Sequence, residues 1–402
     1  MSGSWSSGTG GELAACLAGH AVEFVDRFGS PRPRQFFAPG RVNLMGAHLD
    51  YNGGPVMPLA IDRGTFIALR PRADRRVRFA STIAPEAFEA DLDHLPTARC
   101  GSWADYPLGV LREVLASSDG ADVAGLDILF GGNLAVGAGL SSSASICVGT
   151  ALALSEVWDL DLGTMARVRA ALRAEREFVG VRCGIMDPFA IGLAREGSLL
   201  WLDCKDESTA HLPLDSGRVS LVVADSGVRR ELAAGFFNRR VDECRRAFEI
   251  LRPGQPDATC LRDILPETLE ALRSELGGEL ERRASHVVGE VARTFEARDA
   301  LLDGRLGEFG ERMSRAHESL RDLFEVSCPE LDCLVETAVA QDGVLGGRLT
   351  GAGFGGCAVI LVRRGAEADA MARVGEVFRA RFGRETAVEV YGADSGPREI
   401  EP

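Results

Sequence analysis

The order of apolar and polar positions along the chain predicts a sheet that forms early, behind one N-terminal helix. An amphipathic pattern across 13–25 predicts that helix. Apolar segments at 34–45, 56–70 and 75–82 alternate as half-buried strands do, and Asn52-Gly53-Gly54 supplies a turn after the first of them. The first dozen residues are rich in Gly and Ser, and we expect residues 1–11 to be disordered.

Beyond this sheet the pattern is mostly helical, with short strands before and after the helices. Strands are predicted at 199–202, 219–224, 356–362 and 387–391. The predicted helices span 104–118, 141–158, 163–180, 231–252, 261–273, 279–303, 305–324 and 329–342. Strands that cluster apart from runs of helices favour an α+β fold over a doubly wound α/β fold.

The predicted elements divide into two domains. A cluster of Asp, Glu, Ser and Pro at 205–216 is typical of a boundary. We therefore expect an N-terminal domain over 12–210 and a C-terminal domain over 211–402. The length of 402 residues and the hydrophobic content of 46% are enough for two packed cores.

Composition excludes several kinds of partner. A net charge of −14 argues against nucleic acid and anionic membranes, because a phosphate backbone binds Lys and Arg and repels an acidic surface. The N-terminus lacks the layout of a signal peptide, and no apolar run reaches the roughly 18 residues of a membrane span. The ten cysteines are scattered without a C-x-x-C pair, as reduced packing residues are. We expect a cytoplasmic protein, either a monomer or a weak dimer.

The chain lacks a P-loop, so any ATP site must be built differently. Lys205 is its one lysine, and the tripeptide Gly-Lys-Ser/Thr is absent. In the segment 134–151, Gly137 and Gly139 precede a serine run that opens a predicted helix. Free N–H groups at a helix N-terminus favour a phosphate, although a glycine turn with a serine cap would explain the segment alone.

Two further glycine segments carry candidate chemistry. The glycines of 349–357 match G-x-G-x-x-G formally, but a strand follows them, so a dinucleotide fingerprint is excluded and a tight loop is predicted. In the segment 40–54, Arg41 could stabilise a transferring phosphoryl group. His48 and Asp50 are two apart, so on an extended strand they would share one face and could bind adjacent sugar hydroxyls.

Together with 174–190, these segments resemble motifs of the galactokinase subfamily of the GHMP kinases, and 40–54 resembles the galactokinase signature. The resemblance covers nearly the whole chain, including 283–290 and 314–334. It implies an N-terminal mixed-sheet domain and a C-terminal ferredoxin-like, helix-rich domain. It also implies an enzyme that uses ATP and Mg²⁺ to phosphorylate the anomeric hydroxyl of a small sugar.

The resemblance also implies roles for individual residues. Asp187 and Arg41 would be catalytic, with Asp187 either deprotonating the hydroxyl or only orienting it. Glu175 and Ser143 would hold Mg²⁺. The implied sugar contacts are Ala47, His48, Leu49, Asp50, Gly184, Phe237 and Gly353. The implied ATP contacts are Trp103, Tyr106, Gly137, Gly139, Leu140, Ser141, Ser142, Ser143 and Ala144.

The chain departs from the family pattern at the sugar. Ala47, Leu49 and Phe237 stand where the family has Glu, Thr and Tyr. Loss of groups that hydrogen-bond hydroxyls changes substrate choice. We therefore predict a galactose-like sugar modified or extended at C6, such as the octose of a lincosamide antibiotic. A true galactokinase and a non-catalytic sugar sensor are the alternatives; the intact Arg41 and Asp187 argue against the sensor.

Overall fold

The computed structural model describes residues 9–29, 31–118, 122–135, 137–229 and 233–401. Its largest sheet has six strands in the order β13-β1-β3-β6-β4-β5, and among them only the pair β4 and β6 is parallel. These strands are β1 (Arg34–Asn43), β3 (Pro58–Pro71), β4 (Arg76–Ser81), β5 (Phe88–Asp91), β6 (Leu126–Gly132) and β13 (Arg398–Ile400).

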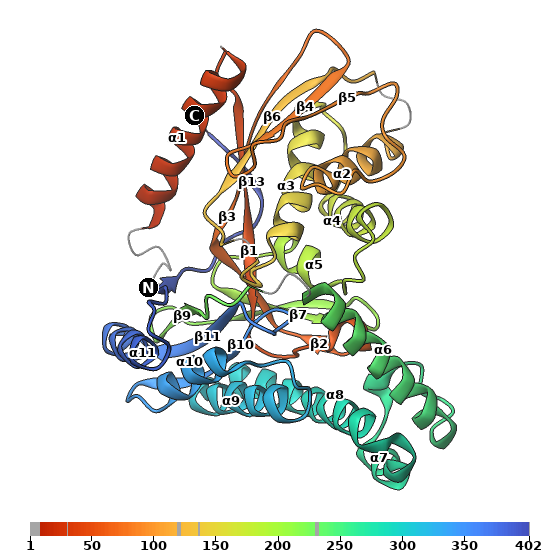
Figure 1. Cartoon of the computed structure of the whole chain (residues 1–402), viewed down its shortest axis with the longest axis vertical. Helices are drawn as coiled ribbons and strands as arrows, with labels where there is room; N and C mark the ends of the chain where they lie inside the picture. The colour runs from red at the N-terminus through yellow and green to blue at the C-terminus, as the bar shows by residue number, and fades with distance from the viewer. Residues whose placement is uncertain (1–8, 30, 119–121, 136, 230–232, 402) are drawn as a thin grey trace.

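Helices cover both faces of this sheet. Helix α1 (Thr9–Phe28) packs on one face (Figure 1). The other face carries α2 (Asp105–Ala116), α3 (Ser142–Val157), α4 (Thr164–Arg173) and α5 (Met186–Gly192). The expected disordered segment 1–11 falls mostly on residues 1–8, outside the described residues, and α1 already begins at Thr9.

A second, smaller sheet and a helix-rich layer complete the molecule below the large sheet in Figure 1. The small sheet pairs β2 (Pro55–Val56), β7 (Ser198–Asp203) and β8 (Thr209–Pro213). The C-terminal sheet has the order β10-β11-β9-β12, from β9 (Val219–Asp225), β10 (Val344–Leu349), β11 (Cys357–Arg363) and β12 (Val388–Tyr391). Its helices are α6 (Ala233–Leu251), α7 (Pro266–Ala271), α8 (Arg273–Leu302), α9 (Leu306–Asp322), α10 (Pro329–Val339) and α11 (Glu367–Phe382).

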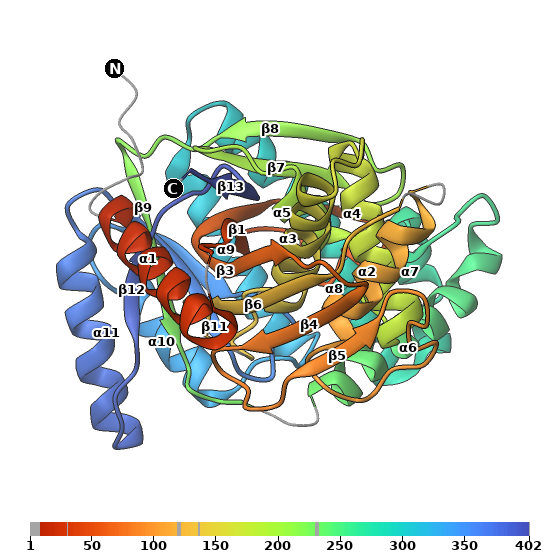
Figure 2. The ribbon, with the colours of Figure 1, turned by 90° about the horizontal axis from the view of Figure 1, so that it is seen from above.

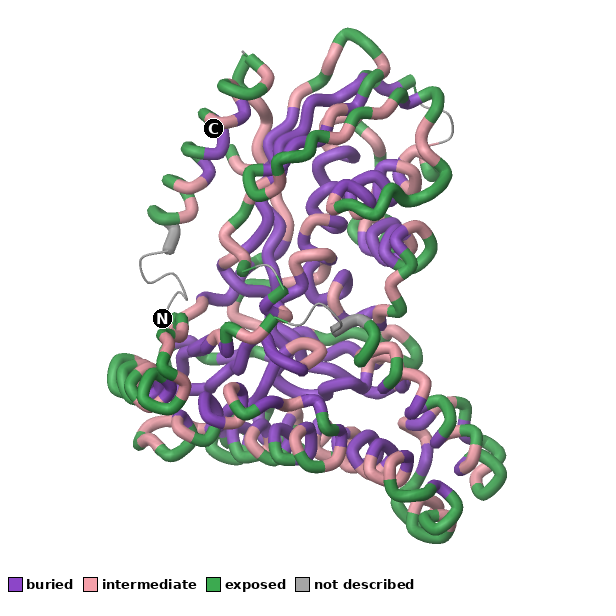
Figure 3. The backbone as a smooth tube through the Cα atoms, viewed as in Figure 1, coloured by how far each residue is buried: buried purple, intermediate pink, exposed green. Residues whose placement is uncertain are grey.

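One hydrophobic cluster joins the two halves. Val42 of β1 and Leu59 of β3 belong to the same buried cluster as Leu221 of β9 and Val359 of β11. Buried backbone is continuous from the large sheet into the C-terminal sheet in Figure 3, while the exposed residues lie on the outer helices and loops. The view from above shows α1 crossing one side of the large sheet and α11 lying beyond it (Figure 2). The predicted α+β architecture is confirmed.

In the described part of the chain, none of the helices is long and apolar enough to cross a membrane.

Candidate active site

A glycine loop leads into the N-terminus of α3. Gly137, Gly139 and Ser141 have φ values of +70°, +77° and +63°, which turn the chain sharply before the helix begins at Ser142. The second glycine loop packs directly against it: a Cβ on Gly351 would lie 2.7 Å from the Gly139 carbonyl oxygen. Only glycine allows the two backbones to approach so closely. The free N–H groups of the first turn of α3 therefore stand at the contact of two loops.

An ion pair lies beside this loop. The Nε and Nη2 atoms of Arg41 donate to the two Asp187 carboxylate oxygens at 2.7 Å each, and Arg41 Nη1 donates to the Gly139 carbonyl at 2.7 Å. The Ser141 hydroxyl donates to Asp187 as well. Arg41 is 4% exposed, whereas the Asp187 side chain, on the first turn of α5, is 26% exposed. The carboxylate is thus held in one orientation and still open to a ligand.

A buried carboxyl group lies on the other side of the serine run. Glu175 belongs to the π-helical turn η2 (Ala174–Val179), is 2% exposed and accepts a hydrogen bond from the Ser143 hydroxyl. Burial is the main reason why the pKa of Glu175 rises to about 7. Mg²⁺ prefers oxygen ligands and commonly takes one or two from the protein and the rest from phosphates and water. Glu175 and Ser143 fit such a pair.

The described residues hold no group of three or more His, Cys, Asp or Glu side chains that could bind a metal without other ligands. A metal at Glu175 would therefore depend on the phosphates of a bound nucleotide for its other ligands.

A cavity of about 370 Å³ lies next to the serine run. Trp103 and Tyr106 line it together with Ser142 and Ser143. The rest of its wall is mostly apolar: Ile83, Ala84, Phe130, Leu134 and Ile146, with Gly64, Thr65, Ser81, Gly131 and Gly132. An apolar slot that ends at a helix N-terminus suits a planar base attached to a phosphate chain.

The signature segment does not continue the strand as the spacing suggested. β1 ends at Asn43, and Gly46 and His48 have φ values of +82° and +58°, so the chain turns twice. The expectation that His48 and Asp50 share a strand face is therefore wrong. His48 Nδ1 lies 2.9 Å from the hydroxyl of Tyr51, and Asp50 begins the 3₁₀ turn η1 (Asp50–Asn52).

The turn brings Asp50 against the loop before α5. A Cβ on Gly184 would collide with the Asp50 carboxylate, so glycine is required there. Burial, followed by the nearby charge of Asp187, raises the pKa of Asp50 to about 6. Asp50 and Asp187 thus lie near each other, and their oxygens can accept hydrogen bonds from neighbouring hydroxyls.

Aromatic rings pack against His48 and Tyr51 of the signature segment. Phe237 of α6 lies edge-on to Tyr51 with ring centroids 5.3 Å apart, and its ring is 6.0 Å from that of His48. Phe324 packs on His48 at 4.7 Å. Phe237 therefore lies beside the candidate sugar residues, as the resemblance implied.

Other residues of the implied site contribute backbone only or lie elsewhere. Leu49 is fully buried and packs against Gly54, so the structure places it in the core and not in the site. Leu140 and Ala144 are buried in hydrophobic clusters. Gly353 packs against the Val326 backbone at a φ of +79°. Ala47 is 2% exposed and, like Leu49, belongs to a core cluster.

Sequence reasoning missed two contacts of the site. Tyr51 is one of the sugar-contacting residue types of the signature, but the sequence did not predict that its hydroxyl would pair with His48. Thr350, beside the second glycine loop, accepts a hydrogen bond from the Asn43 N–H at 2.9 Å and so ties that loop to the end of β1. The first had a signal in the motif, whereas the second joins residues too far apart in sequence for any spacing to reveal.

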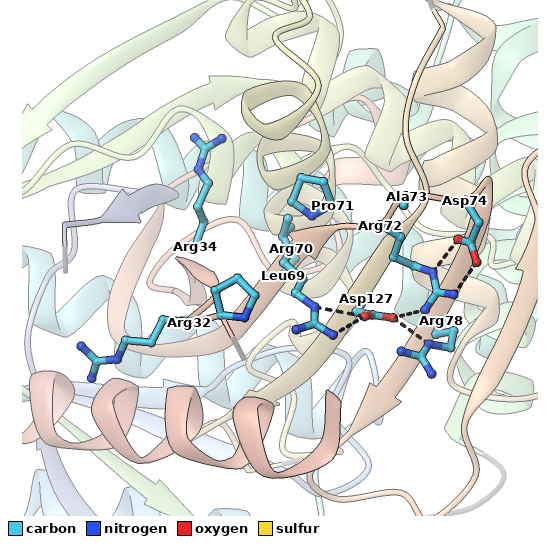
Figure 4. A pocket seen from close by; sticks show the side chains of 11 residues that line it. Arg32, Arg34, Leu69, Arg70, Pro71, Arg72, Ala73, Asp74, Arg78 and Asp127 are labelled. Atoms are coloured by element: carbon cyan, nitrogen blue, oxygen red, sulfur yellow. Dashed lines mark hydrogen bonds and ion pairs between the residues drawn. The ribbon is translucent and has the colours of Figure 1, made fainter. Parts of the chain in front are cut away.

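A larger hollow of about 640 Å³ lies at one end of the strands β1, β3, β4 and β6 and shares no residue with the base cavity (Figure 4). Its guanidinium groups are already engaged: Arg70, Arg72 and Arg78 all donate to the buried carboxylate of Asp127. Arg32 points away from this cluster. The arginines that line the hollow therefore form an ion-pair network with Asp127, and this network links β3, β4 and β6.

Comparison with family models defines the class of protein. Residues 22–71 match the galactokinase galactose-binding signature. Residues 105–195 match the GHMP kinase N-terminal domain, and residues 297–380 match the GHMP kinase C-terminal domain. A mevalonate kinase crystal structure, 19% identical, superposes on 89% of this chain and 98% of its own with a TM-score of 0.66, which shows the shared fold. The fold is that of a two-domain GHMP kinase.

Individual relatives show to which family of GHMP kinases the chain belongs. The galactokinase of Exiguobacterium sibiricum is 39% identical over 380 residues, 94% of this chain and 97% of its own. That of Bacillus subtilis is 38% identical, over 91% and 94% respectively. The crystal structure of Lactococcus lactis galactokinase complexed with galactose is 33% identical, with a TM-score of 0.90 over 96% of this chain and 100% of its own. The chain belongs to the galactokinase family and is a sugar kinase.

Proposed function

We propose that this enzyme transfers the γ-phosphoryl group of ATP to the anomeric hydroxyl of a galactose-configured sugar, giving ADP and a sugar 1-phosphate. The observation that carries the proposal is the position of Asp187. It lies between the glycine loop and the turn that holds His48 and Asp50, and Arg41 and Ser141 fix its carboxylate. A hydroxyl bound there would lie beside both a proton acceptor and the phosphate loop.

In this reaction a bond forms between the anomeric oxygen and the γ-phosphorus, and the bond to the β,γ-bridging oxygen of ATP breaks. Asp187 orients the hydroxyl and receives its proton. Arg41 neutralises charge on the phosphoryl oxygens, and the N–H groups at the start of α3 bind the phosphate chain. Glu175 and Ser143 would hold Mg²⁺, which supplies further neutralisation when bound.

For the sugar, galactose itself is the first candidate. Relatives at 38–39% identity over almost their full length carry the name galactokinase, and the signature model matches despite Ala47 and Leu49. His48 and Asp50, the polar groups of the signature turn, are present. Their placement near Asp187 supports a sugar whose other hydroxyls bind to His48 and Asp50 while the anomeric hydroxyl reacts at Asp187.

A sugar altered at C6 is the second candidate, and the apolar ring of Phe237 beside the signature segment favours it. Phe237 presents a ring without a hydroxyl at His48 and Tyr51, and Ala47 replaces an acid. Ala47 and Leu49 are both buried in the core, and a core residue does not select a substrate, so their burial removes these two positions from the argument. One substitution, Phe237, thus favours a changed sugar.

Steady-state kinetics with galactose, 6-deoxygalactose and 6-O-methylgalactose separates the two candidates. Preference for galactose in kcat/KM by about tenfold or more over the 6-deoxy sugar would show a productive contact with the C6 hydroxyl. Equal or reversed preference would favour a sugar altered at C6. Phosphorylation of none of the three would contradict the proposal. Phe237→Tyr is the matched variant, which restores the hydroxyl of the family residue.

A further inference from the structure

The turn that carries the sugar residues is held by side chains of the C-terminal domain. Glu290 of α8 accepts hydrogen bonds from the N–H groups of Gly46 and Ala47 at 3.1 and 3.2 Å. Arg348 of β10 donates to the Leu44 carbonyl at 3.3 Å. These contacts join residues more than 240 positions apart in the chain.

A buried charge lies at the centre of this arrangement. Glu290 is 0% exposed, and its second carboxylate oxygen accepts from Arg293 Nε at 2.9 Å. The Arg348 guanidinium, 1% exposed, lies 3.8 Å from the oxygen that binds the turn. A buried carboxylate is tolerated only where it is paired and hydrogen-bonded, and here two of its partners are backbone groups of the sugar turn.

A neutral histidine holds the carbonyl side of the same turn. His286 Nε2 lies 3.3 Å from the Ala47 carbonyl oxygen, and Nδ1 lies 2.8 Å from the Ser319 hydroxyl. Burial lowers the pKa of His286 to about 3, so the ring is neutral at physiological pH. Nε2 must then donate to the carbonyl, and Nδ1 accepts from Ser319.

The backbone of this turn needs such support. Gly46 and His48 both have positive φ, and His48 is a residue with a Cβ, for which that region is unfavourable by roughly 1–2 kcal/mol. The conformation of the turn sets the direction of the His48 side chain, which lies beside the Tyr51 hydroxyl. In the described part of the glycine loop before α3, in contrast, no residue is hydrogen-bonded to Glu290, His286 or Arg348.

We propose that Glu290, His286 and Arg348 are positioning residues for the sugar: they hold the turn 44–48 so that His48 and Asp50 meet the substrate. The inference rests on the proposed function, because it concerns the sugar site of that reaction. It assigns sugar affinity in part to residues of helix α8 and strand β10, which act through the backbone of the turn.

Glu290→Gln tests this assignment. The substituted side chain lacks the charge between Arg293 and Arg348, and it has one acceptor oxygen and one NH2 donor group in place of two acceptor oxygens. We expect KM for the sugar to rise about tenfold and KM for ATP to stay within about twofold, because one charged hydrogen-bond partner of the turn is lost. Thr294→Val is the matched control: Thr294 is buried one turn further along α8 and donates only to the Glu290 main-chain carbonyl at 2.7 Å.

Wild type, Glu290→Gln and Thr294→Val are compared by KM for sugar, KM for ATP, kcat and thermal melting. A selective rise in sugar KM in Glu290→Gln alone supports the inference. Unchanged sugar KM in a folded variant, or an equal rise in both KM values, overturns it. If Glu290→Gln does not fold, Ser319→Ala replaces it, with an expected rise of about threefold in sugar KM and the same overturning outcomes. A wild-type enzyme without activity on galacto sugars would instead refute the proposed function.

Discussion

At the residue scale, Asp187 connects the candidate sugar site to the phosphate loop. Its carboxylate is bound by Arg41 from β1 and by Ser141 from the glycine loop, so the sugar side and the phosphate side share one acid. An arginine fork that binds both carboxylate oxygens fixes the plane of the group as well as its position. The same guanidinium reaches the Gly139 carbonyl, which couples the position of the acid to that of the loop.

Asp187→Asn should lower kcat by about a thousandfold, because the amide cannot accept the proton of the anomeric hydroxyl. We expect sugar binding, measured by calorimetry, to change by less than about tenfold, since His48 and Asp50 remain. Loss of binding together with activity, or a kcat within tenfold of wild type, would show that Asp187 has another role.

Asp50→Asn tests the buried carboxyl through pH. Burial raises the pKa of Asp50 from 3.8 to about 6, so the folded state favours the protonated carboxyl. The contribution of this carboxyl to the stability of the folded state is therefore complete below pH 3.8 and is lost as the pH rises through 6. We therefore expect the asparagine variant to be inactive but more stable than wild type by about 3 kcal/mol near pH 8, with the gap closing towards pH 4.

Thermal melts of wild type and Asp50→Asn between pH 4.5 and 8 measure this gap. Asp257→Asn, at an exposed aspartate outside the site, is the control and should show no such trend. A gap that stays constant across the range would contradict the assigned burial of the Asp50 carboxyl.

The resemblance to family motifs predicted which residues lie together in this site. Arg41, Asp187, Glu175 and the serine run lie together as the motifs implied. Leu49 shows the limit of that reasoning, because a position inside a binding motif can still point into the core. Whether a side chain faces ligand or core depends on φ at its neighbours, which composition does not reveal.

At the scale of elements, the two glycine loops act as one unit. Gly139 and Gly351 have positive φ and meet backbone to backbone, and Thr350 ties the second loop to the end of β1. Such contact allows the C-terminal domain to set the position of the phosphate loop.

Gly351→Ala should separate these loops. The added methyl would meet the Gly139 carbonyl oxygen at 2.7 Å and would stand at a φ of +78°. We expect a lower melting temperature and a KM for ATP about tenfold higher, because positive φ is unfavourable for alanine and the loop must move. Gly375→Ala in helix α11, where a Cβ meets nothing within 4 Å, should instead stabilise by about 0.5–1 kcal/mol. Similar effects of both changes would contradict the contact.

Periodicity located elements better than it located turns and pairings. The predicted strand at 75–82 is β4, and the predicted helix at 141–158 is α3. The predicted helix at 163–180 contains α4 but ends in the π-helical turn η2, which places Glu175. Strand β13 went unpredicted, because three residues at the chain end carry no pattern until they pair with β1.

At the scale of the whole molecule, the two domains share a hydrophobic cluster and one candidate site. The cluster that joins β1 and β3 to β9 and β11 makes the glycine loops, the sugar turn and α8 parts of a continuous packed body. Family motifs predicted both domains, but the contacts of Glu290 with the sugar turn depend on how the domains meet. A local sequence pattern cannot predict how the two domains pack on each other, because their interface joins segments that are far apart in the sequence.

The most direct test of the central claim is the identity of the product. Purified wild-type enzyme is incubated with ATP, Mg²⁺ and galactose or a C6-altered galacto sugar, and the product is examined by phosphorus and proton NMR. The account predicts ADP and a sugar phosphorylated at the anomeric oxygen, with no such product from Asp187→Asn. Phosphate on any other hydroxyl, or no sugar phosphate from any galacto-configured sugar, would contradict it.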